Sequence, residues 1–343
     1  MRLINTSTGV VETFLGRNIP QYAILSHTWE YEEVSFADIT QPSRNKSLKG
    51  FAKIEGTCKL ALTEGFQYAW VDTCCIDKTS SSKLSEAINY MYRWYQRSAT
   101  CYVYLSDLNS DDLETALPKC RWFTRAWTLQ ELIAPQALHF YDASWNYRGS
   151  KSNLGQLLST ITGIDSAVLR HETALSSLSV AQRMAWAARR ETTLVEDRAY
   201  SLLGILRLNM PLLYGEEGGT FRKLQEEIIK SILDSSIFAW RLPAHTRPPE
   251  HGKGRFVSGI MAESPDLFAD CLSFCRQPTH SVPEFSVSSR GIKTNSIIHR
   301  YDHSADAGQL ESNWLRYGLI LPLDCCLASG PALGIFLKKM RAI

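Results

Sequence analysis

The first half of the chain alternates stretches that predict β-strands with stretches that predict helices, and this alternation constrains the fold most. Apolar runs rich in β-formers occupy residues 22–29, 68–77, 100–108 and 137–145. Apolar residues at helical spacing occupy the segments between them, at 51–65, 82–98 and 122–134. Strands separated by helices favour crossover connections and a parallel sheet. We therefore expect an α/β domain over residues 1–150, with a mostly parallel sheet flanked by helices.

Polar side chains lie where several of these predicted strands end. Ser26 and His27 close the first strand, and Asp72 lies at the end of the second. Ligands of open parallel sheets bind outside the carboxyl ends of the strands, so we expect these side chains to converge on one edge. Glu131 follows the third strand and can reach the same edge. Trp127 lies one helical turn before it.

The segment WTLQEL at residues 127–132 allows two interpretations. An ionised Glu131 could bind ribose hydroxyls and stabilise an oxocarbenium-like transition state, with Trp127 stacking on a flat ring. Alternatively, Glu131 is a solvated helix residue or an ion-pair partner of Arg125, because surface glutamates are common. A hydrolase triad of Ser26, His27 and Asp72 is disfavoured, since no GxSxG elbow surrounds Ser26.

The second half of the chain has a different pattern. Amphipathic helical segments predominate over residues 151–240, which we expect to form a helical extension packed on the first domain. Prolines, glycines and charges at 241–256 predict a linker. Short strand-like runs over 257–343 predict a small β-rich region, and the end of the chain directly after such a run favours an incomplete module. GEEGG at 215–219 predicts a turn, because two glutamates and the missing GxxxxGK[ST] argue against phosphate.

Composition and charge narrow the functional classes. A formal net charge of +2 gives no reason to expect a nucleic-acid partner. There is no apolar run of about 18 residues, so no transmembrane segment is expected. The nine cysteines include no CxxC pair, and several lie in apolar runs. This pattern favours reduced, buried thiols over a disulfide framework and predicts no metal site. Together with the absence of a secretory signal pattern, it predicts a cytoplasmic protein.

Four segments together resemble the fungal heterokaryon-incompatibility (HET) domain and its flanking region. YAILSHTW, then WVDTCCID with SEAINYMYRWYQRSATCYVYLSDL, then RAWTLQEL are similar to the three successive blocks of that domain. Residues 182–228 resemble the region that commonly follows, so the resemblance covers roughly residues 1–240. Three features depart from the family pattern: Lys78 stands where glutamine is usual, Ala126 stands where glycine is usual, and GEEGG at 215–219 replaces a more usual GEG followed by alanine and phenylalanine.

The resemblance implies a function in fungal self/non-self recognition and induced cell death. HET domains are thought to be similar to TIR domains, which have a flavodoxin-like fold, and several TIR domains cleave NAD with a glutamate that corresponds to Glu131. By the same correspondence Trp127 is the tryptophan of the WCxxEL block. The implied reaction is hydrolysis of the nicotinamide–ribose bond, with NAD or a related nucleotide as substrate and no bound cofactor.

In that interpretation Glu131 is catalytic, Trp127 and an aromatic residue of the helix at Tyr90 to Tyr95 wall the base, and Ser26, His27 and Asp72 fix hydroxyls or phosphate. Self-association and death-pathway proteins are the implied partners. A non-enzymatic signalling module, in which WTLQEL forms a protein interface, stays open as the alternative. A metabolic enzyme that has borrowed the fold is a third interpretation, and Lys78 and Ala126 keep it open.

Overall fold

The computed structural model describes residues 1–16, 18–41, 47–241, 259–276, 284–289, 291–301, 318–327 and 332–337. Contacts divide the chain into two units. The first holds Met1–Ala174 and Arg190–Leu212, and the second holds Leu175–Arg189 and Leu213–Ile343. The predicted linker at 241–256 lies outside the described residues apart from Arg241. The predicted domain borders at residues 150 and 240 stay predictions.

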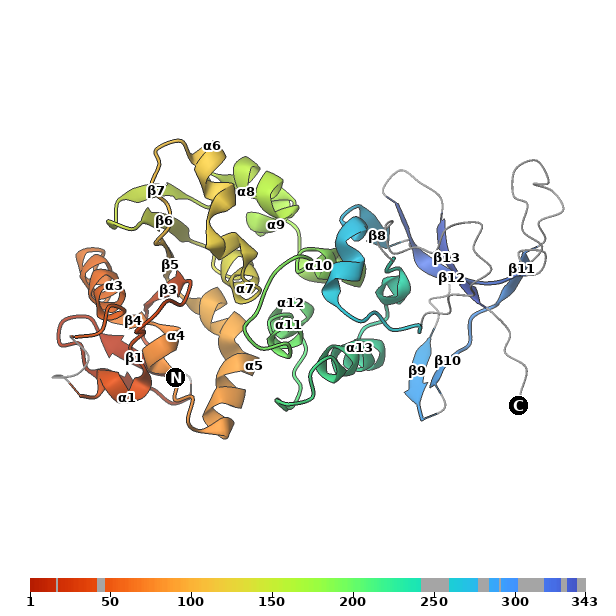
Figure 1. Ribbon diagram of the computed structural model, residues 1–343, viewed down its shortest axis with the longest axis horizontal. Helices are drawn as coiled ribbons and strands as arrows, with labels where there is room; N and C mark the ends of the chain where they lie inside the picture. Colours follow the sequence, from red (N-terminus) through yellow and green to blue (C-terminus); the bar gives the residue numbers. More distant parts are fainter. Residues whose placement is uncertain are drawn as a thin grey trace. The chain divides into compact units, whose positions relative to one another are not determined.

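A seven-stranded sheet forms the centre of the first unit (Figure 1). Its order is β2 (Val11–Thr13), β1 (Arg2–Asn5), β4 (Tyr68–Trp70), β3 (Ala23–His27), β5 (Thr100–Leu105), β6 (Leu138–Asp142) and β7 (Tyr147–Ser150). The four inner strands β4, β3, β5 and β6 run parallel to one another. The predicted α/β class, with a mostly parallel sheet flanked by helices, is therefore confirmed for this unit. The antiparallel edge strands β1, β2 and β7 are additions that the sequence pattern did not predict.

Helices cover both faces of this sheet. The helix α3 (Phe51–Thr63) lies on one face, where the Tyr102 hydroxyl of β5 donates to Glu64 just after the helix, at 2.6 Å. The helices α5 (Ser81–Arg97) and α7 (Trp127–Ile133) lie on the other (Figure 1), where Trp70 of β4 packs edge-on against Tyr95. Because successive strand residues point to opposite faces, the sequence of β3 distributes its side chains between these two layers.

Amphipathic spacing accounts for α5, the longest of the described helices. Ser80 caps its first turn by accepting a hydrogen bond from the Lys83 backbone N–H. Ala87, Ile88, Met91 and Tyr95 are buried along one side, as the apolar stripe in the sequence predicts.

The second predicted strand is shorter than its β-forming residues suggest. β4 ends at Trp70, and α4 (Asp72–Cys75) begins almost at once. Asp72 lies at the first position of this helical turn, where the positive end of the helix dipole favours a carboxylate. Its side chain also accepts hydrogen bonds from two residues at and just beyond the end of β3, which fixes the chain in a turn.

The remaining elements of the first unit are short. They are α1 (Phe36–Ile39), α6 (Leu113–Ala116), η1 (Leu117–Lys119), η2 (Arg121–Thr124), α8 (Gly155–Thr162), α9 (Ser166–Leu169), α11 (Asp197–Tyr200) and α12 (Leu203–Leu206). The helix α12 packs on α5, although about 110 residues separate them in the sequence. Gly204 makes this approach possible, because a Cβ at its position would lie 2.1 Å from Cβ of Tyr92.

The second unit combines helices with short antiparallel strands. Its helical elements are η3 (Leu175–Ser177), α10 (Val180–Ala185), α13 (Gly219–Ser231), η4 (Ser235–Phe238) and η6 (Pro265–Cys271). The strand β12 (Gly318–Leu327) pairs with β11 (His299–Tyr301), β13 (Ala332–Leu337) and β8 (Phe274–Arg276), and β9 (Phe285–Ser288) pairs with β10 (Gly291–Thr294). Buried polar contacts join helices to strands here; for example, the Ser235 backbone N–H donates to the Asp324 carboxylate at 2.9 Å.

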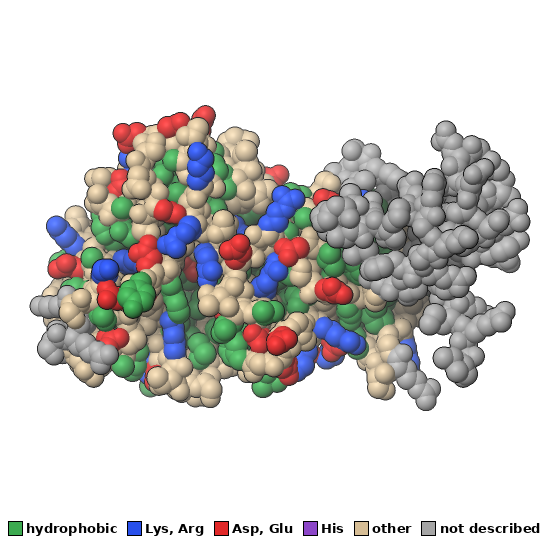
Figure 2. Space-filling model, in the orientation of Figure 1, with side chains coloured by type: hydrophobic (Ala, Val, Ile, Leu, Met, Phe, Trp, Pro, Cys, Tyr) green, Lys and Arg blue, Asp and Glu red, His purple; other side chains and the backbone are tan. Residues whose placement is uncertain are grey.

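The surface of the described residues has no dominant sign of charge on the face shown in Figure 2, where Lys and Arg side chains are interspersed with Asp and Glu. This mixture agrees with the formal net charge of +2. Within the described ranges, no helix has both the length and the apolar composition needed to span a bilayer.

The α5–α12 contact predicts the effect of Gly204→Ala. The added methyl group meets Tyr92 and forces the two helices apart, so the free energy of unfolding should fall by about 1–3 kcal/mol. Gly155→Ala at the start of α8 is the matched control, because a Cβ added there would have no other atom within 4 Å. Chemical denaturation of both variants measures the difference. An equal stability of the two variants would contradict this account of the helix contact.

Candidate functional site

A buried chain of hydrogen bonds connects α7 to the end of β3. The Trp122 indole N–H donates to Ser26 Oγ at 2.7 Å, and Ser26 Oγ donates to Glu131 Oε2 at 2.5 Å. All three residues are buried, and Glu131 is only 7% exposed. Glu131 is therefore neither a solvated helix residue nor engaged with Arg125, whose guanidinium donates to Thr193. Its carboxyl group is an interior group with a specific partner.

Burial controls the protonation of Glu131. Removal from water raises its pKa, the hydrogen bond from Ser26 opposes the rise, the negative charge of Asp72 adds to it, and the nearby Tyr95 hydroxyl opposes it. The net result is a pKa of about 8. The side chain is therefore mostly a neutral acid at pH 7 in this conformation.

Two buried cations bind backbone carbonyls around α7. Arg190 Nη1 donates to the Arg125 carbonyl at 2.9 Å, just before the helix. Lys151 Nζ donates to the carbonyls of Leu132 and Pro135 at its end, where the helix dipole favours positive charge. Burial lowers the pKa of Lys151 to about 8 and the pKa of Arg190 to about 10. These contacts fix the position of the helix that carries Glu131.

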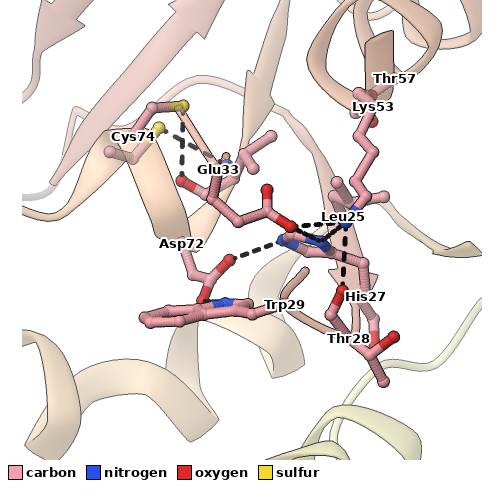
Figure 3. Close-up of polar contacts among 12 residues, drawn as sticks. Leu25, His27, Thr28, Trp29, Glu33, Lys53, Thr57, Asp72 and Cys74 are labelled. Atoms are coloured by element: carbon pink, nitrogen blue, oxygen red, sulfur yellow. Dashed lines mark hydrogen bonds and ion pairs between the residues drawn. The ribbon is translucent and has the colours of Figure 1, made fainter. Parts of the chain in front are cut away.

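A second polar cluster lies on the opposite face of β3 (Figure 3). His27 Nε2 lies 3.0 Å from Asp72 Oδ1, and the Trp29 indole N–H donates to Asp72 Oδ2 at 2.7 Å. Burial alone would raise the pKa of Asp72. The hydrogen bond from His27, the positive charge of Lys78 and the hydrogen bond from Trp29 together lower it below its ordinary value. Asp72 is therefore a carboxylate at neutral pH.

Lys53 of α3 completes this second cluster. It is 5% exposed, and its Nζ lies 2.5 Å from Glu33, 3.1 Å from the Thr28 carbonyl and 3.4 Å from His27 Nδ1. With the ammonium donating to Nδ1, the Nε2 atom of His27 carries the proton that faces Asp72. Figure 3 shows His27 held between Asp72 and Lys53.

A cavity of about 490 Å³ opens beside the second cluster. Its lining includes Trp29, Glu33, Thr73 and Lys78. Trp29 is 51% exposed, and Lys78 Nζ lies 3.4 Å from the centre of its ring system, a cation–π contact. Lys78 therefore covers one face of the Trp29 ring at the edge of this cavity. Glu131 is not among the residues that line it.

The structure divides the predicted site residues between two clusters. Ser26 and Glu131 meet on the α7 face, whereas His27 and Asp72 meet on the α3 face. The expected convergence on one edge is thus incomplete, because Ser26 and His27 are consecutive residues of a strand. The disfavoured Ser–His–Asp triad is not formed, since Ser26 bonds to Glu131 and Trp122 and not to His27. Trp127 lies partly exposed at the first position of α7.

Two aromatic residues of α5, Tyr95 and Tyr90, lie in different environments. Tyr95 is fully buried beside Glu131, and its hydroxyl donates to the Leu25 carbonyl at 2.9 Å. Tyr90 instead lines a separate cavity of about 440 Å³ together with Arg93 and Trp94. No residue of that cavity belongs to either polar cluster. The roles assigned to the five predicted site residues stay predictions.

Sequence reasoning missed several partners in these clusters. The pattern did not mark Trp122 and Trp29 as hydrogen-bond donors, and it did not mark Lys53 and Glu33 as members of a site. The only signal for Lys53 is its position one residue before the buried Ile54 in α3. A lysine there ordinarily extends to solvent, so the pattern alone does not indicate burial. Among the described residues, no group of three or more His, Cys, Asp or Glu side chains could hold a metal ion.

Comparisons with known proteins support the resemblance found in the sequence. Residues 22–121 match the family described as "Heterokaryon incompatibility protein (HET)", and residues 219–312 match a "Domain of unknown function (DUF8212)". The chain is 45% identical over 260 residues to the vegetative incompatibility protein HET-E-1 of Podospora anserina. The match covers 72% of this chain and 19% of that protein, so the chain spans about a fifth of its curated relative. No solved structure matches the chain.

The Ser26–Glu131 hydrogen bond predicts that Ser26→Ala destabilises the fold. The substitution leaves the buried Trp122 N–H and the Glu131 carboxyl without their shared partner, at a cost of about 1–3 kcal/mol. Ser106→Ala is the matched control, because Ser106 directly follows the central strand β5 and also donates to a glutamate, Glu30, but at an exposed site. That control should lose less than about 0.5 kcal/mol in denaturation. Equal losses of stability in the two variants would show that the buried Ser26 hydrogen bond stabilises the fold no more than the exposed one of Ser106.

The raised pKa of Glu131 predicts a pH-dependent effect of Glu131→Gln. A buried acid with a pKa of about 8 stabilises the fold fully below its ordinary pKa near 4.5, and this contribution declines as the pH rises through 8. Glutamine does not titrate. The variant should therefore gain stability relative to the wild type between pH 5 and pH 9, on the order of a few kcal/mol.

Denaturation curves of the variant and the wild type at pH 5 and pH 9 measure this gain. The change in stability of the wild type between the two pH values is subtracted from that of the variant, which removes the contribution of all other titrating groups. Glu114→Gln, at an exposed position in α6, should follow the wild type throughout. A constant difference between Glu131→Gln and the wild type at all pH values would contradict the raised pKa.

Proposed function

We propose that this chain, whose residues 22–121 match the heterokaryon incompatibility family, takes part in fungal self/non-self recognition that ends in cell death. The name of its relative, a vegetative incompatibility protein, supports this function. We place the protein in the cytoplasm, with death-pathway proteins and further copies of itself as partners.

We further propose that the domain is TIR-like and hydrolyses NAD. The order of its elements supports the likeness: β3, α3, β4, α5, β5, α7 and β6 alternate, and Glu131 lies in the helix that follows β5. The observation that carries the proposal is the buried Glu131 carboxyl, with its pKa near 8 and its bond to a serine at a strand end. Ionisable groups with such perturbed pKa values concentrate at functional sites.

The proposed reaction breaks the bond between nicotinamide and ribose C1′. Nicotinamide leaves with the bonding electron pair, and positive charge develops on the ribose ring. The Glu131 carboxylate stabilises this charge, and Ser26 orients the carboxylate. Water then adds to C1′ and releases a proton to solvent. Trp127 walls the base, and His27 and Asp72 bind the hydroxyl or phosphate groups.

This chemistry requires Glu131 to ionise and to contact the ligand. In the conformation described here the carboxyl is buried and mostly protonated at pH 7, so we propose that the structure represents a closed state. Self-association of several copies is the proposed trigger that opens it. While the closed state predominates, the rate should increase with pH up to about 8, because opening then requires the loss of the Glu131 proton.

The burial of Glu131 also favours a second function. Its carboxyl is hydrogen-bonded to Ser26 inside the protein, an arrangement that stabilises a fold without any catalysis. The domain then acts as a non-enzymatic signalling module through its surface. Exposed residues of α5 such as Tyr90, which is 44% exposed, are candidates for that interface.

The proposals predict different outcomes in one set of variants. Purified protein at high concentration is incubated with NAD between pH 6 and pH 9, and nicotinamide release is followed. Glu131→Gln should lower the rate at least about a hundredfold. Glu114→Gln should leave it unchanged. Thermal melts must first show that all three proteins are folded.

An assembled, folded wild type that leaves NAD intact would refute the hydrolase. The same variants are then expressed in fungal cells. Cell death that persists in Glu131→Gln but is lost in Tyr90→Ala would support the signalling module.

A further inference from the structure

Two cysteines face each other across neighbouring strands in the second unit. Cys275 of β8 and Cys326 of β12 are directly paired in the antiparallel register. Their Sγ atoms lie 3.0 Å apart, and Cys275 Sγ also lies 3.5 Å from the Cys326 carbonyl oxygen. Side chains at directly opposed positions of an antiparallel pair are the closest neighbours in a sheet. A displacement of about 1 Å would bring the sulfurs to bonding distance.

Their exposure separates these two cysteines from the rest. The other seven, which are Cys58, Cys74, Cys75, Cys101, Cys120, Cys271 and Cys325, are buried. Cys275 and Cys326 are partly exposed. Strand alternation explains the difference, because the adjacent Phe274 and Cys325 point into the core. A small oxidant can therefore reach this pair while the protein stays folded.

The strand β8 is in a position where a covalent bond would have a structural effect. It has three residues and pairs with β12. The Ser179 hydroxyl before α10 also donates to the Phe274 carbonyl at 2.9 Å, and Arg276 Nη2 donates to the Leu233 carbonyl at 2.7 Å. β8 thus connects the helices of this unit to its sheet. A short strand with few backbone hydrogen bonds opens easily, and a cross-link would prevent that opening.

We propose that Cys275 and Cys326 form a redox-active dithiol site, which a low-molecular-weight disulfide such as oxidised glutathione converts to a cross-strand disulfide. One protein thiolate attacks the glutathione disulfide and forms a mixed disulfide, releasing one glutathione thiolate. The second protein thiolate then attacks the protein sulfur of that mixed disulfide and releases the second glutathione. The two protein thiols lose two electrons and two protons in total, and two molecules of reduced glutathione are formed. The site does not depend on NAD hydrolysis.

The test oxidises the folded 343-residue chain in buffers of increasing oxidised-to-reduced glutathione ratio. Free thiols are then alkylated, and the peptides are mapped by mass spectrometry. The Cys275–Cys326 cross-link should form before any other cysteine is modified. It should raise the thermal midpoint of the protein by about 5–10 °C and slow amide exchange at residues 274–276. Dithiothreitol should reverse all three changes.

Variants separate a paired site from two independent thiols. Cys326→Ser should abolish the cross-link and leave Cys275 as a mixed disulfide with glutathione. Cys58→Ala, in the first unit, should leave the cross-link intact. Oxidation of the folded wild type that yields only glutathione adducts at Cys275 or Cys326, or no change at either, would overturn the proposal. If the cross-link forms but changes neither the thermal midpoint nor amide exchange at residues 274–276, the proposed stabilisation of β8 is wrong.

Discussion

The hydrogen bond between Ser26 and Glu131 is the contact on which the arrangement of the first unit depends. It joins the central strand β3 to α7 through a carboxyl group that is kept neutral by burial. The same serine accepts from Trp122, and the Thr128 hydroxyl donates to the carbonyls of Trp122 and Arg125. The turn between η2 and α7 is therefore held at several points. Loss of one member leaves buried polar groups unsatisfied, which is more costly than loss of an exposed hydrogen bond.

Residues far along the chain contribute to this arrangement. Lys151 and Arg190 bind the carbonyls at the end of α7 and just before it, and both are buried cations whose charge is stabilised by backbone dipoles. Gly204 brings α12 against α5, the helix that supplies Tyr95. The α/β sheet and the helices that follow it are thus one packing unit up to Leu212, with residues 175–189 excepted. The matched family region at residues 22–121 stops before Glu131 and before all three of these contacts.

Regular periodicity made much of the fold predictable. The apolar run of β3 and the stripe from Ala87 to Tyr95 identify a central strand and a helix without any tertiary information. The helical turn at Asp72 was not predictable, because it depends on hydrogen bonds from His27 and Trp29. The sequence pointed to Ser26, His27, Asp72 and Glu131 as polar site residues, but it did not show that they form two separate clusters. Sequence order shows which residues end strands, whereas partners such as Lys53 and Trp122 come from other elements and carry no local signal.

The two polar clusters share one peptide bond. Ser26 serves the α7 face and His27 serves the α3 face solely because they are neighbours on an extended strand. Apolar substitutions of the buried residues Ala23, Ile24 and Leu25 change the packing of β3 but leave Ser26 and His27 on their own faces. An insertion or deletion of one residue there would send the serine toward Asp72 and the histidine toward Glu131, exchanging every polar partner at once. Both clusters therefore depend on the length of this segment more than on its composition, and an in-frame gain or loss of one codon would disrupt them together.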